Sequence, residues 1–261
     1  MRLLILGHYE IASNYAISLL VEKLLSTKFE CNIQIALSGK GDKKLEKDSV
    51  EKTGENEFQQ LAAYERHLCD ELEINHQSSR LNLKINSFSR LEKLAQNKVE
   101  LLSNPNSAEG LRLIKQWNPD LIISIRYRKI FRDQAIAIPR LGIINLHSGL
   151  LPEYRGAMAT FWSMLNKEEV YGSTLHYISD KSIDTGAIIA RKVQKLNYSQ
   201  TYLDNVINLY SSGVDNIMSA LIKLQNNSHL DVQMPENKGN YYSFPEIMDL
   251  VQFKKMNLKL Y

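Results

Sequence analysis

The sequence predicts an α/β fold, a mostly parallel sheet flanked by helices, on three observations. Residues 2–6 form an apolar run that ends at Gly7, a helical pattern of apolar residues follows, and Asn32–Leu37 is a second apolar run. A strand–helix–strand order of this kind favours a parallel sheet with right-handed crossovers. Leu121–Ile125 is almost entirely apolar, as expected of a central parallel strand covered on both faces. Together these observations predict a Rossmann-like architecture.

The other elements are predicted from apolar spacing and from residues that end helices. Near-helical spacing of apolar residues predicts helices over residues 58–72, 91–96, 107–117, 157–165, 201–224 and 245–253. Asn118-Pro119 ends the third of these, because a proline disfavours helix at the preceding residue. Apolar runs predict strands over residues 81–85, 141–144, 173–178 and 187–193, with the last two paired.

Composition is ordinary for a soluble globular protein. The 261 residues are 44% hydrophobic and 23% charged, and the net charge of +3 is too small to indicate nucleic-acid or membrane binding. Cys31 and Cys69 lie outside any CxxC pair, so we interpret both as small buried hydrophobes in a reducing compartment. The N-terminal run lacks the features of a signal peptide, and no apolar run approaches the roughly 20 residues of a membrane span. We therefore expect a cytoplasmic protein without membrane contact.

Three polar side chains follow predicted strands and carry the chemistry. Asn145 and His147 come directly after the run 141–144, and alternation along a strand places them on one face. Asp184 lies in the turn after the run 173–178. Such a cluster suits acyl transfer to an amine. Asn145 can donate a hydrogen bond to the developing oxyanion, worth roughly 3 kcal/mol by analogy with other acyl-transfer sites.

The remaining two members of the cluster have proton-handling roles. His147 can take the proton of the attacking amine or, when charged, join Asn145 in holding the oxyanion. Asp184 would orient the imidazole and help relay the proton through water. No covalent intermediate is needed, and Ser148 is not in a nucleophile elbow. The structural alternatives are a turn role for the Asn and Asp and a hydrogen-bonded structural role for the His.

Two other kinds of site are less well supported. Metal binding by His147, Asp184 and His176 is an alternative, but His176 falls within a strand among apolar neighbours and no spacing favours zinc, so we predict no metal site. The first strand ends in Gly7-His8-Tyr9-Glu10 and lacks the GxGxxG motif of a dinucleotide site. His8 is either a ligand contact or a solvated loop histidine.

One block of sequence is specific for a known family. Residues 145–156 spell N-x-H-S-x-L-L-P-x-Y-R-G, and D-T-G follows at 184–186. This combination resembles the formyltransferases that use 10-formyltetrahydrofolate as formyl donor, with the match covering roughly residues 121–196. The resemblance implies a formyltransferase-type fold, with residues 1–196 as the catalytic domain and residues 197–261 as a C-terminal helix and extension packed on it.

The resemblance also implies binding residues on two sides of the cluster. The donor-side residues that it implies, against the pterin, are Tyr127, Arg128, Lys129, Ile130 and Asp180. The acceptor-side residues that it implies are Ser148, Tyr154, Arg155 and Trp162. Two alternatives stay open: Arg128 as a solvated surface residue, and Arg155-Gly156 as a structural turn whose arginine packs on Glu153.

The acceptor is predicted from features outside the block. About 65 residues follow residue 196, too few for the C-terminal barrel of roughly 100 residues expected of a tRNA formyltransferase. The turn Gly7-His8-Tyr9-Glu10 replaces a Gly-rich phosphate loop and counts against a phosphoribosyl acceptor. Residues 239–245, GNYYSFP, are similar to the tail of sugar N-formyltransferases. We therefore predict a nucleotide-linked 4-amino-4,6-dideoxy sugar, in lipopolysaccharide biosynthesis, as the acceptor.

Several alternatives to this acceptor stay open. They are hydroxyornithine, glycinamide ribonucleotide, and a non-catalytic homologue that binds folate or a nucleotide sugar. Residues 38–56, rich in Lys, Glu, Asp and Gly, are typical of an exposed insertion, and within them 39–55 could serve as an acceptor lid. The apolar C-terminal helix could pair with a second copy in a homodimer or close the core.

Overall fold

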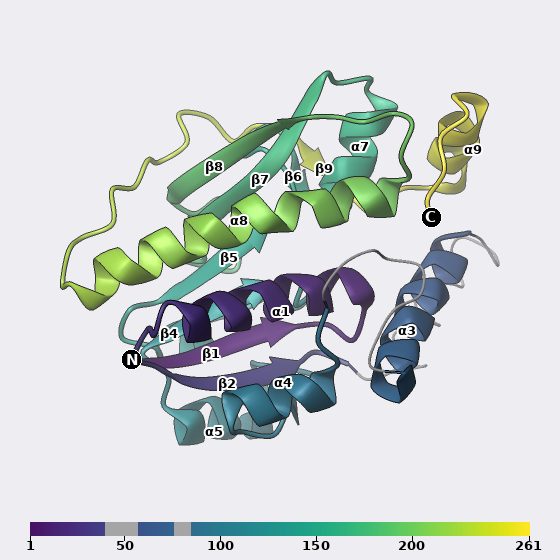
Figure 1. Ribbon diagram of the computed structural model, residues 1–261. Helices are drawn as coiled ribbons and strands as arrows, with labels where there is room; N and C mark the ends of the chain where they lie inside the picture. Colours follow the sequence, from purple (N-terminus) through teal and green to yellow (C-terminus); the bar gives the residue numbers. More distant parts are fainter. Residues whose placement is uncertain (40–56, 76–84) are drawn as a thin grey trace.

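The computed structural model describes residues 1–39, 57–75 and 85–261. Within these ranges, seven strands form one sheet in the order β3-β2-β1-β4-β5-β7-β8 (Figure 1). Their bounds are β1 Arg2–Gly7, β2 Asn32–Leu37, β3 Glu100–Leu101, β4 Leu121–Ile125, β5 Ile143–His147, β7 Val170–Tyr177 and β8 Ile188–Lys195. Strands β1 to β5 are parallel, while β7 and β8 run antiparallel to their neighbours. The predicted mostly parallel α/β sheet is confirmed.

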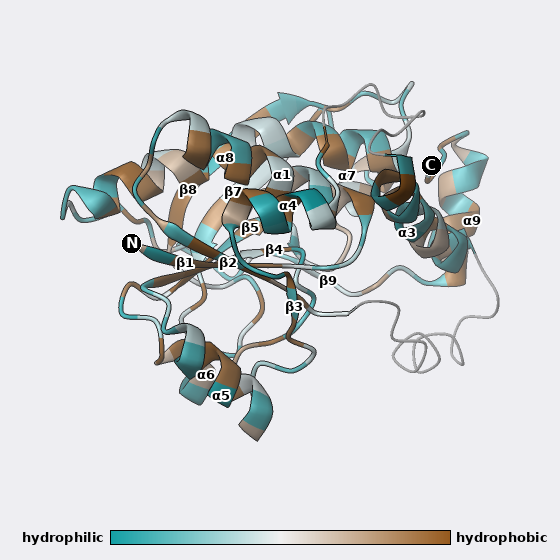
Figure 2. Ribbon diagram, turned by 60° about the horizontal axis from the view of Figure 1, so that its bottom comes forward, coloured by the Kyte–Doolittle hydropathy of each residue, from teal (hydrophilic) through white to brown (hydrophobic). Residues whose placement is uncertain are grey.

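Helices cover both faces of the sheet. Their bounds are α1 Ile11–Ser26, α3 Glu57–Asn75, α4 Phe88–Ala95, α5 Ala108–Trp117, α6 Asp133–Ile136, α7 Ala159–Leu165, α8 Tyr202–Gln225 and α9 Ile247–Lys255. Figure 2 shows the apolar strands β1 and β2 between α1, α4 and α8 on one side and α5 and α6 on the other. Strand β1 divides accordingly, with Leu3 and Ile5 in one apolar core and Leu4 and Leu6 in the other. Burial on both faces explains why this strand is apolar throughout.

The ends of the helices follow local sequence signals. Ser107 caps α5 by accepting a hydrogen bond from Gly110 N (3.0 Å), and Asn118 ends that helix in the left-handed conformation. Thr201 and Asp204 form a reciprocal capping box at the start of α8. Helix α8 packs along α1 and across β7 and β8, so the chain after residue 197 shares the main core. The division at residues 196/197 stays a prediction.

Some predicted strand bounds were wrong, because pairing with a neighbouring strand extends the strand further than its apolar run. The strand expected to end at Ile144 continues through His147, because antiparallel pairing with β7 joins Asn145 to His176 and His147 to Thr174. Antiparallel pairing with β8, which joins Val170 to Lys195, starts β7 at Val170 rather than at residue 173. Four short elements were not predicted: β3, α6, and the strands β6 (Arg155–Gly156) and β9 (Tyr241–Tyr242), which pair with each other.

Two predictions fall on parts of the chain outside the described residues. The insertion expected over residues 38–56 is described only at its first two residues, and the strand expected over 81–85 only at Ile85, which is not in a strand. Among the helices of the described ranges, none combines the length and the apolar character needed to cross a bilayer.

Candidate active site

The three side chains predicted to act together lie together. Asn145 and His147 come from β5, and Asp184 comes from the turn after β7. The Nδ1 atom of His147 lies 3.5 Å from Asp184 Oδ2. The other oxygen, Oδ1, lies 3.3 Å from Nε2 of His176, and that nitrogen is 3.1 Å from Asn145 Nδ2. His176 therefore links the amide to the carboxylate and is a fourth member of the cluster.

Sequence reasoning weighed His176 only as an alternative metal ligand. The strand register explains its place, because His176 on β7 is paired directly with Asn145 on β5. Its Nδ1 lies 2.9 Å from the Tyr177 carbonyl oxygen, so both ring nitrogens have partners. Within the described ranges, no group of three or more His, Cys, Asp or Glu residues is arranged to hold a metal ion.

The loop after β5 supplies two backbone contacts to the cluster. The Tyr154 carbonyl oxygen lies 2.7 Å from His147 Nε2, and Gly156 N donates a hydrogen bond to Asp184 Oδ2 (2.9 Å). Both partners of the His147 ring, a carbonyl and a carboxylate, accept hydrogen bonds. A doubly protonated imidazolium satisfies this arrangement in full.

Asp184 is ionised in this setting. Burial alone would raise the pKa of its carboxyl, but the nearby His147 ring, the His176 hydrogen bond and the Gly156 N–H hold that pKa well below its usual range. The residue itself has a left-handed backbone conformation, with φ of 55°. The turn thus fixes a buried negative charge between two histidine rings.

The predicted donor-side residues occupy different environments. Tyr127 is buried, stacks on Phe131 with ring centroids 5.6 Å apart, and donates its hydroxyl hydrogen to the Leu102 carbonyl. Ile130 is 52% exposed, and its carbonyl accepts a hydrogen bond from a neighbouring asparagine side chain at 2.7 Å. Lys129 is partly buried, whereas Asp180 is exposed and accepts a hydrogen bond from Ser182 N (2.6 Å). Their roles toward a donor stay predictions.

The side chain of Arg128 is 45% exposed but pairs with a charge cluster whose carboxylates are buried, which sequence reasoning missed. The Glu10 carboxylate, at the N-cap position of α1, forms ion pairs with Arg126 and Arg128, and Arg126 also lies 3.5 Å from Glu65. Burial raises the pKa of Glu10, but the two arginines bring it down to about 2. Burial and the Glu10 charge raise the pKa of Glu65 to about 7. Arg128 is therefore more than a solvated surface residue.

His8 lies beside this charge cluster, at the end of β1. It is partly buried, and its Nδ1 lies 2.9 Å from Ser38 Oγ. Burial, together with the charge of Arg128, lowers the pKa of His8 to about 4. A solvated loop histidine does not describe this environment, and the ring is neutral at pH 7.

The predicted acceptor-side residues surround the loop after β5. Ser148 is partly buried, and its carbonyl accepts a hydrogen bond from Thr160 Oγ1 (3.2 Å). Tyr154 is buried, and its hydroxyl donates to a glutamate at 2.6 Å. Trp162 Nε1 donates to the Ser243 carbonyl (3.1 Å). The buried Nε of Arg155 has no hydrogen-bond partner among the described residues, and within them no ion pair joins it to an acidic residue such as Glu153.

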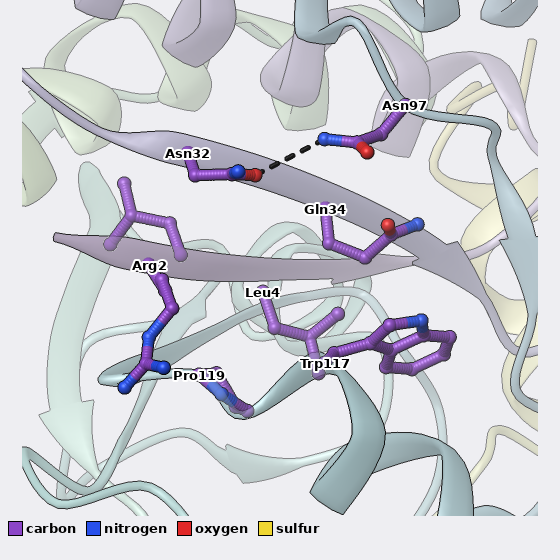
Figure 3. A pocket seen from close by; sticks show the side chains of 8 residues that line it. Arg2, Leu4, Asn32, Gln34, Asn97, Trp117 and Pro119 are labelled. Atoms are coloured by element: carbon purple, nitrogen blue, oxygen red, sulfur yellow. Dashed lines mark hydrogen bonds between the residues drawn. The ribbon is translucent and has the colours of Figure 1, made fainter.

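A separate hollow lies at the opposite edge of the sheet. Figure 3 shows it beside the amino-terminal ends of the paired strands β1 and β2, lined by Arg2, Leu3, Leu4, Asn32, Gln34, Asn97, Trp117 and Pro119. Its amide side chains bond to one another and to the backbone, as in the 3.1 Å contact from Asn97 Nδ2 to Asn32 Oδ1. In open α/β sheets, ligands bind at the carboxyl ends of the strands. The candidate site is therefore the cluster around Asp184.

The chain is similar to known proteins in both sequence and fold. The profile of the formyl transferase family matches residues 75–208. A methionyl-tRNA formyltransferase from Caldanaerobacter subterraneus subsp. tengcongensis is 30% identical over 162 residues, which cover 59% of this chain and 51% of that protein. The chain thus spans about half the length of this protein and of a second methionyl-tRNA formyltransferase, and less than half of others that it matches.

Solved structures share the fold at low sequence identity. A sugar N-formyltransferase from Shewanella sp FDAARGOS_354 superposes with a TM-score of 0.60 at 17% identity, covering 98% of this chain and 87% of that one. An N-formyltransferase from Helicobacter canadensis, in complex with folinic acid and dTDP-3-aminofucose, gives a TM-score of 0.56 at 18% identity, covering 92% and 70%. At these identities the likeness shows the fold.

Proposed function

The chain belongs to the formyl transferase family, and from this premise we propose that it transfers a formyl group from 10-formyltetrahydrofolate to the amine of a small molecule. One observation carries the proposal. The Asp184 carboxylate lies 3.5 Å from the His147 imidazole, and Asn145 is joined to the same carboxylate through His176. These are the groups that attack of an amine on a formyl carbon requires.

The proposed mechanism follows the charges that develop during attack. The amine nitrogen bonds to the formyl carbon, and negative charge builds on the carbonyl oxygen. Asn145 donates a hydrogen bond to that oxygen, and the His147 imidazolium, held between two acceptors, adds a positive charge. Asp184 stays ionised and stabilises the imidazolium. As the carbonyl re-forms, the bond between the formyl carbon and the folate nitrogen breaks, and the proton released by the attacking nitrogen passes to that folate nitrogen.

The residues after β4 fit a folate donor, which supplies the activated formyl group when bound. Ile130 offers an exposed apolar side chain at the carboxyl edge of the sheet, and its backbone is fixed by a hydrogen bond. Strand β4 is the parallel neighbour of β5, which carries Asn145. In the proposal, residues 127–130 and Asp180 bind the donor on this side of the cluster.

A nucleotide-linked 4-amino-4,6-dideoxy sugar is the proposed acceptor. Residues 239–244, whose sequence motivates this choice, lie against Arg155 and Trp162. An anionic group such as a diphosphate would give the unpartnered Arg155 Nε an acceptor. The Helicobacter canadensis structure holds dTDP-3-aminofucose, a nucleotide-linked 3-amino sugar, and so supports a nucleotide-linked amino sugar as acceptor, while the 4-amino position rests on the sequence of the C-terminal segment alone. Lipopolysaccharide biosynthesis in the cytoplasm is the setting that this class implies.

The test is an acceptor screen read by mass spectrometry. The full chain is incubated with 10-formyltetrahydrofolate and, separately, with dTDP-, UDP- and GDP-linked 4-amino-4,6-dideoxy sugars, hydroxyornithine, glycinamide ribonucleotide and methionyl-tRNA. We expect one nucleotide sugar to gain one formyl group, and Asn145→Ala and His147→Ala to abolish that gain.

Each other outcome revises a different part of the proposal. A gain on hydroxyornithine or another acceptor alone would replace the sugar. No gain on any acceptor, with folate or nucleotide-sugar binding retained in calorimetry, would identify a non-catalytic binding protein. An unchanged rate in Asn145→Ala would remove the proposed mechanism.

A further inference from the structure

Strand β9 joins the C-terminal part of the chain to the loop that contacts the catalytic cluster. Arg155 N donates to the Asn240 carbonyl (3.1 Å), and Ala157 N donates to the Tyr242 carbonyl (2.9 Å). Gly156 N, between these two amides, donates instead to Asp184 Oδ2 (2.9 Å). Successive amides of an extended chain point in opposite directions. One short stretch is therefore shared between the C-terminal segment and the catalytic carboxylate.

The side chain of Tyr242 holds the residue just before this stretch. Its ring stacks on that of Tyr154, with centroids 5.2 Å apart and planes 8° apart, and it also lies against Trp162 at 5.1 Å. The hydroxyls of both tyrosines accept hydrogen bonds from Asn166 (3.2 Å each). The Tyr154 carbonyl is the acceptor for His147 Nε2. Both backbone groups that contact the cluster thus lie in residues bound by the C-terminal segment.

The two chain segments approach too closely for any added side chain. Gly239 has φ of 57°, and a Cβ atom there would lie 1.8 Å from the Pro152 carbonyl oxygen. Gly156 has φ of 100°, and its Cβ would lie 2.1 Å from the Tyr242 carbonyl oxygen. Both positions require glycine for conformation and for space. The geometry of residues 152–157 is consequently set by the seating of residues 239–242.

We propose that residues 239–242, here termed the positioning segment, align the catalytic pair His147 and Asp184 through the backbone of residues 154–156. Gly239 and Tyr242 are its positioning residues. Neither contacts the His147 or Asp184 side chain, and each acts through the loop. The kinetic test of this inference, which measures kcat, rests on the proposed formyl transfer. The structural test, which measures an amide NMR signal, does not.

The proposal predicts a loss in turnover more than in donor binding. If the segment shifts, the Gly156 N–H and the Tyr154 carbonyl move relative to the carboxylate and the imidazole. Displacements of about 1 Å at catalytic groups cost up to roughly 100-fold in rate. The loop after β4, proposed to bind the donor, makes no hydrogen bond with residues 239–242 among the described residues. The donor KM should therefore stay nearly constant.

The test compares Gly239→Ala with Lys238→Ala, the same new residue one position earlier. Lys238 is exposed, so its variant leaves the seating of the segment unchanged. We expect Gly239→Ala to lower kcat at least roughly tenfold with less than about a threefold change in donor KM, and Lys238→Ala to match the wild type. A Gly239→Ala protein that is folded and has wild-type kcat overturns the proposal. An equal loss in both variants does the same.

A second pair of variants guards against a Gly239→Ala chain that does not fold. Tyr242→Phe keeps the ring stack, whereas Tyr242→Ala removes it. We expect the phenylalanine variant to retain kcat within roughly threefold and the alanine variant to lose at least roughly tenfold, with the same constant donor KM. Equal kcat values in the two variants would contradict the proposal.

Amide NMR tests the positioning segment without any assay of activity. The Gly156 amide proton, bonded to an ionised carboxylate, should resonate downfield in the wild type and move upfield in Gly239→Ala but not in Lys238→Ala. If no acceptor is ever formylated and this difference is still seen, the proposed function fails while the positioning role stands. If formylation is observed and the Gly156 signal is the same in all three proteins, the positioning role fails alone.

Discussion

The substitution Asp184→Asn tests the charge at the centre of the candidate site. It preserves shape but removes the negative charge that lies 3.5 Å from His147 Nδ1. With an effective dielectric constant of about 20, Coulomb's law gives an attraction of about 5 kcal/mol at that distance. Because about 1.4 kcal/mol equals a tenfold change in rate, complete loss of this interaction would slow the reaction several-thousandfold. We expect a fall in kcat of roughly 10²- to 10³-fold, since the asparagine keeps part of the hydrogen bonding.

The assay is the dependence of kcat on pH, with the acceptor found in the screen. In the wild type, the carboxylate stays ionised throughout the usual range because its pKa lies far below it. In Asp184→Asn the side chain carries no charge at any pH, so the rate deficit relative to the wild type should persist throughout that range. Asp231→Asn, the same change at an exposed loop position, is the matched control and should behave as the wild type.

Two results would refute this reasoning. One is a kcat within about threefold of the wild type for a folded Asp184→Asn protein. The other is an equal loss of kcat in the Asp231→Asn control, which would show that the loss does not come from the charge at the candidate site. A melting curve for each protein separates loss of folding from loss of catalysis.

Four further predictions concern the free energy of unfolding, measured by chemical denaturation. Glu10→Gln should lower the free energy of unfolding by about 3–5 kcal/mol, because it leaves Arg126 without its main partner. Glu65→Gln should lower the free energy of unfolding by less than about 1 kcal/mol at pH 6. In the wild type, stability should fall as pH rises from the unfolded pKa of Glu65 near 4.5 to its folded pKa of about 7, and the variant should not show this fall. Burial raises the pKa of Asp120, but hydrogen bonds from two arginines lower it to about 2. Asp120→Asn should therefore cost about 1–2 kcal/mol at pH 7 and almost nothing near pH 2, where the wild type has lost the same stabilisation. Thr201→Ala should cost about 1 kcal/mol through loss of the α8 capping box, and an unchanged midpoint would contradict the assigned cap.

Much of the sheet could be predicted because local sequence determines it. The bounds of β2 and β4 agree with the apolar runs that predicted them, since strands covered on both faces have few alternatives. The caps at Ser107 and Thr201 are likewise short-range signals. The contact between His147 and Asp184 was also predicted, because the sequence assigns each of them to the end of a strand or to the turn after it.

The rest of the site depends on contacts between distant parts of the chain. His176 joins the cluster through the antiparallel register of β7, and no local pattern gives that register. Arg126 meets Glu10 across 116 positions of sequence and does so from a left-handed backbone conformation. Strand β9 is two residues long, so its partner is found only when the whole fold is known.

The adjacency of β4 and β5 has a consequence for laboratory evolution. Ser124 pairs with Asn145, and the proposed donor loop begins three residues after Ser124. The proposed acceptor residue Arg155 instead belongs to a separate ribbon with β9, and Tyr154 directly precedes that ribbon. Libraries randomised at residues 127–130 and libraries randomised around Arg155 therefore alter different sides of the candidate site. Variants selected for a new formyl donor should be combinable with variants selected for a new amine.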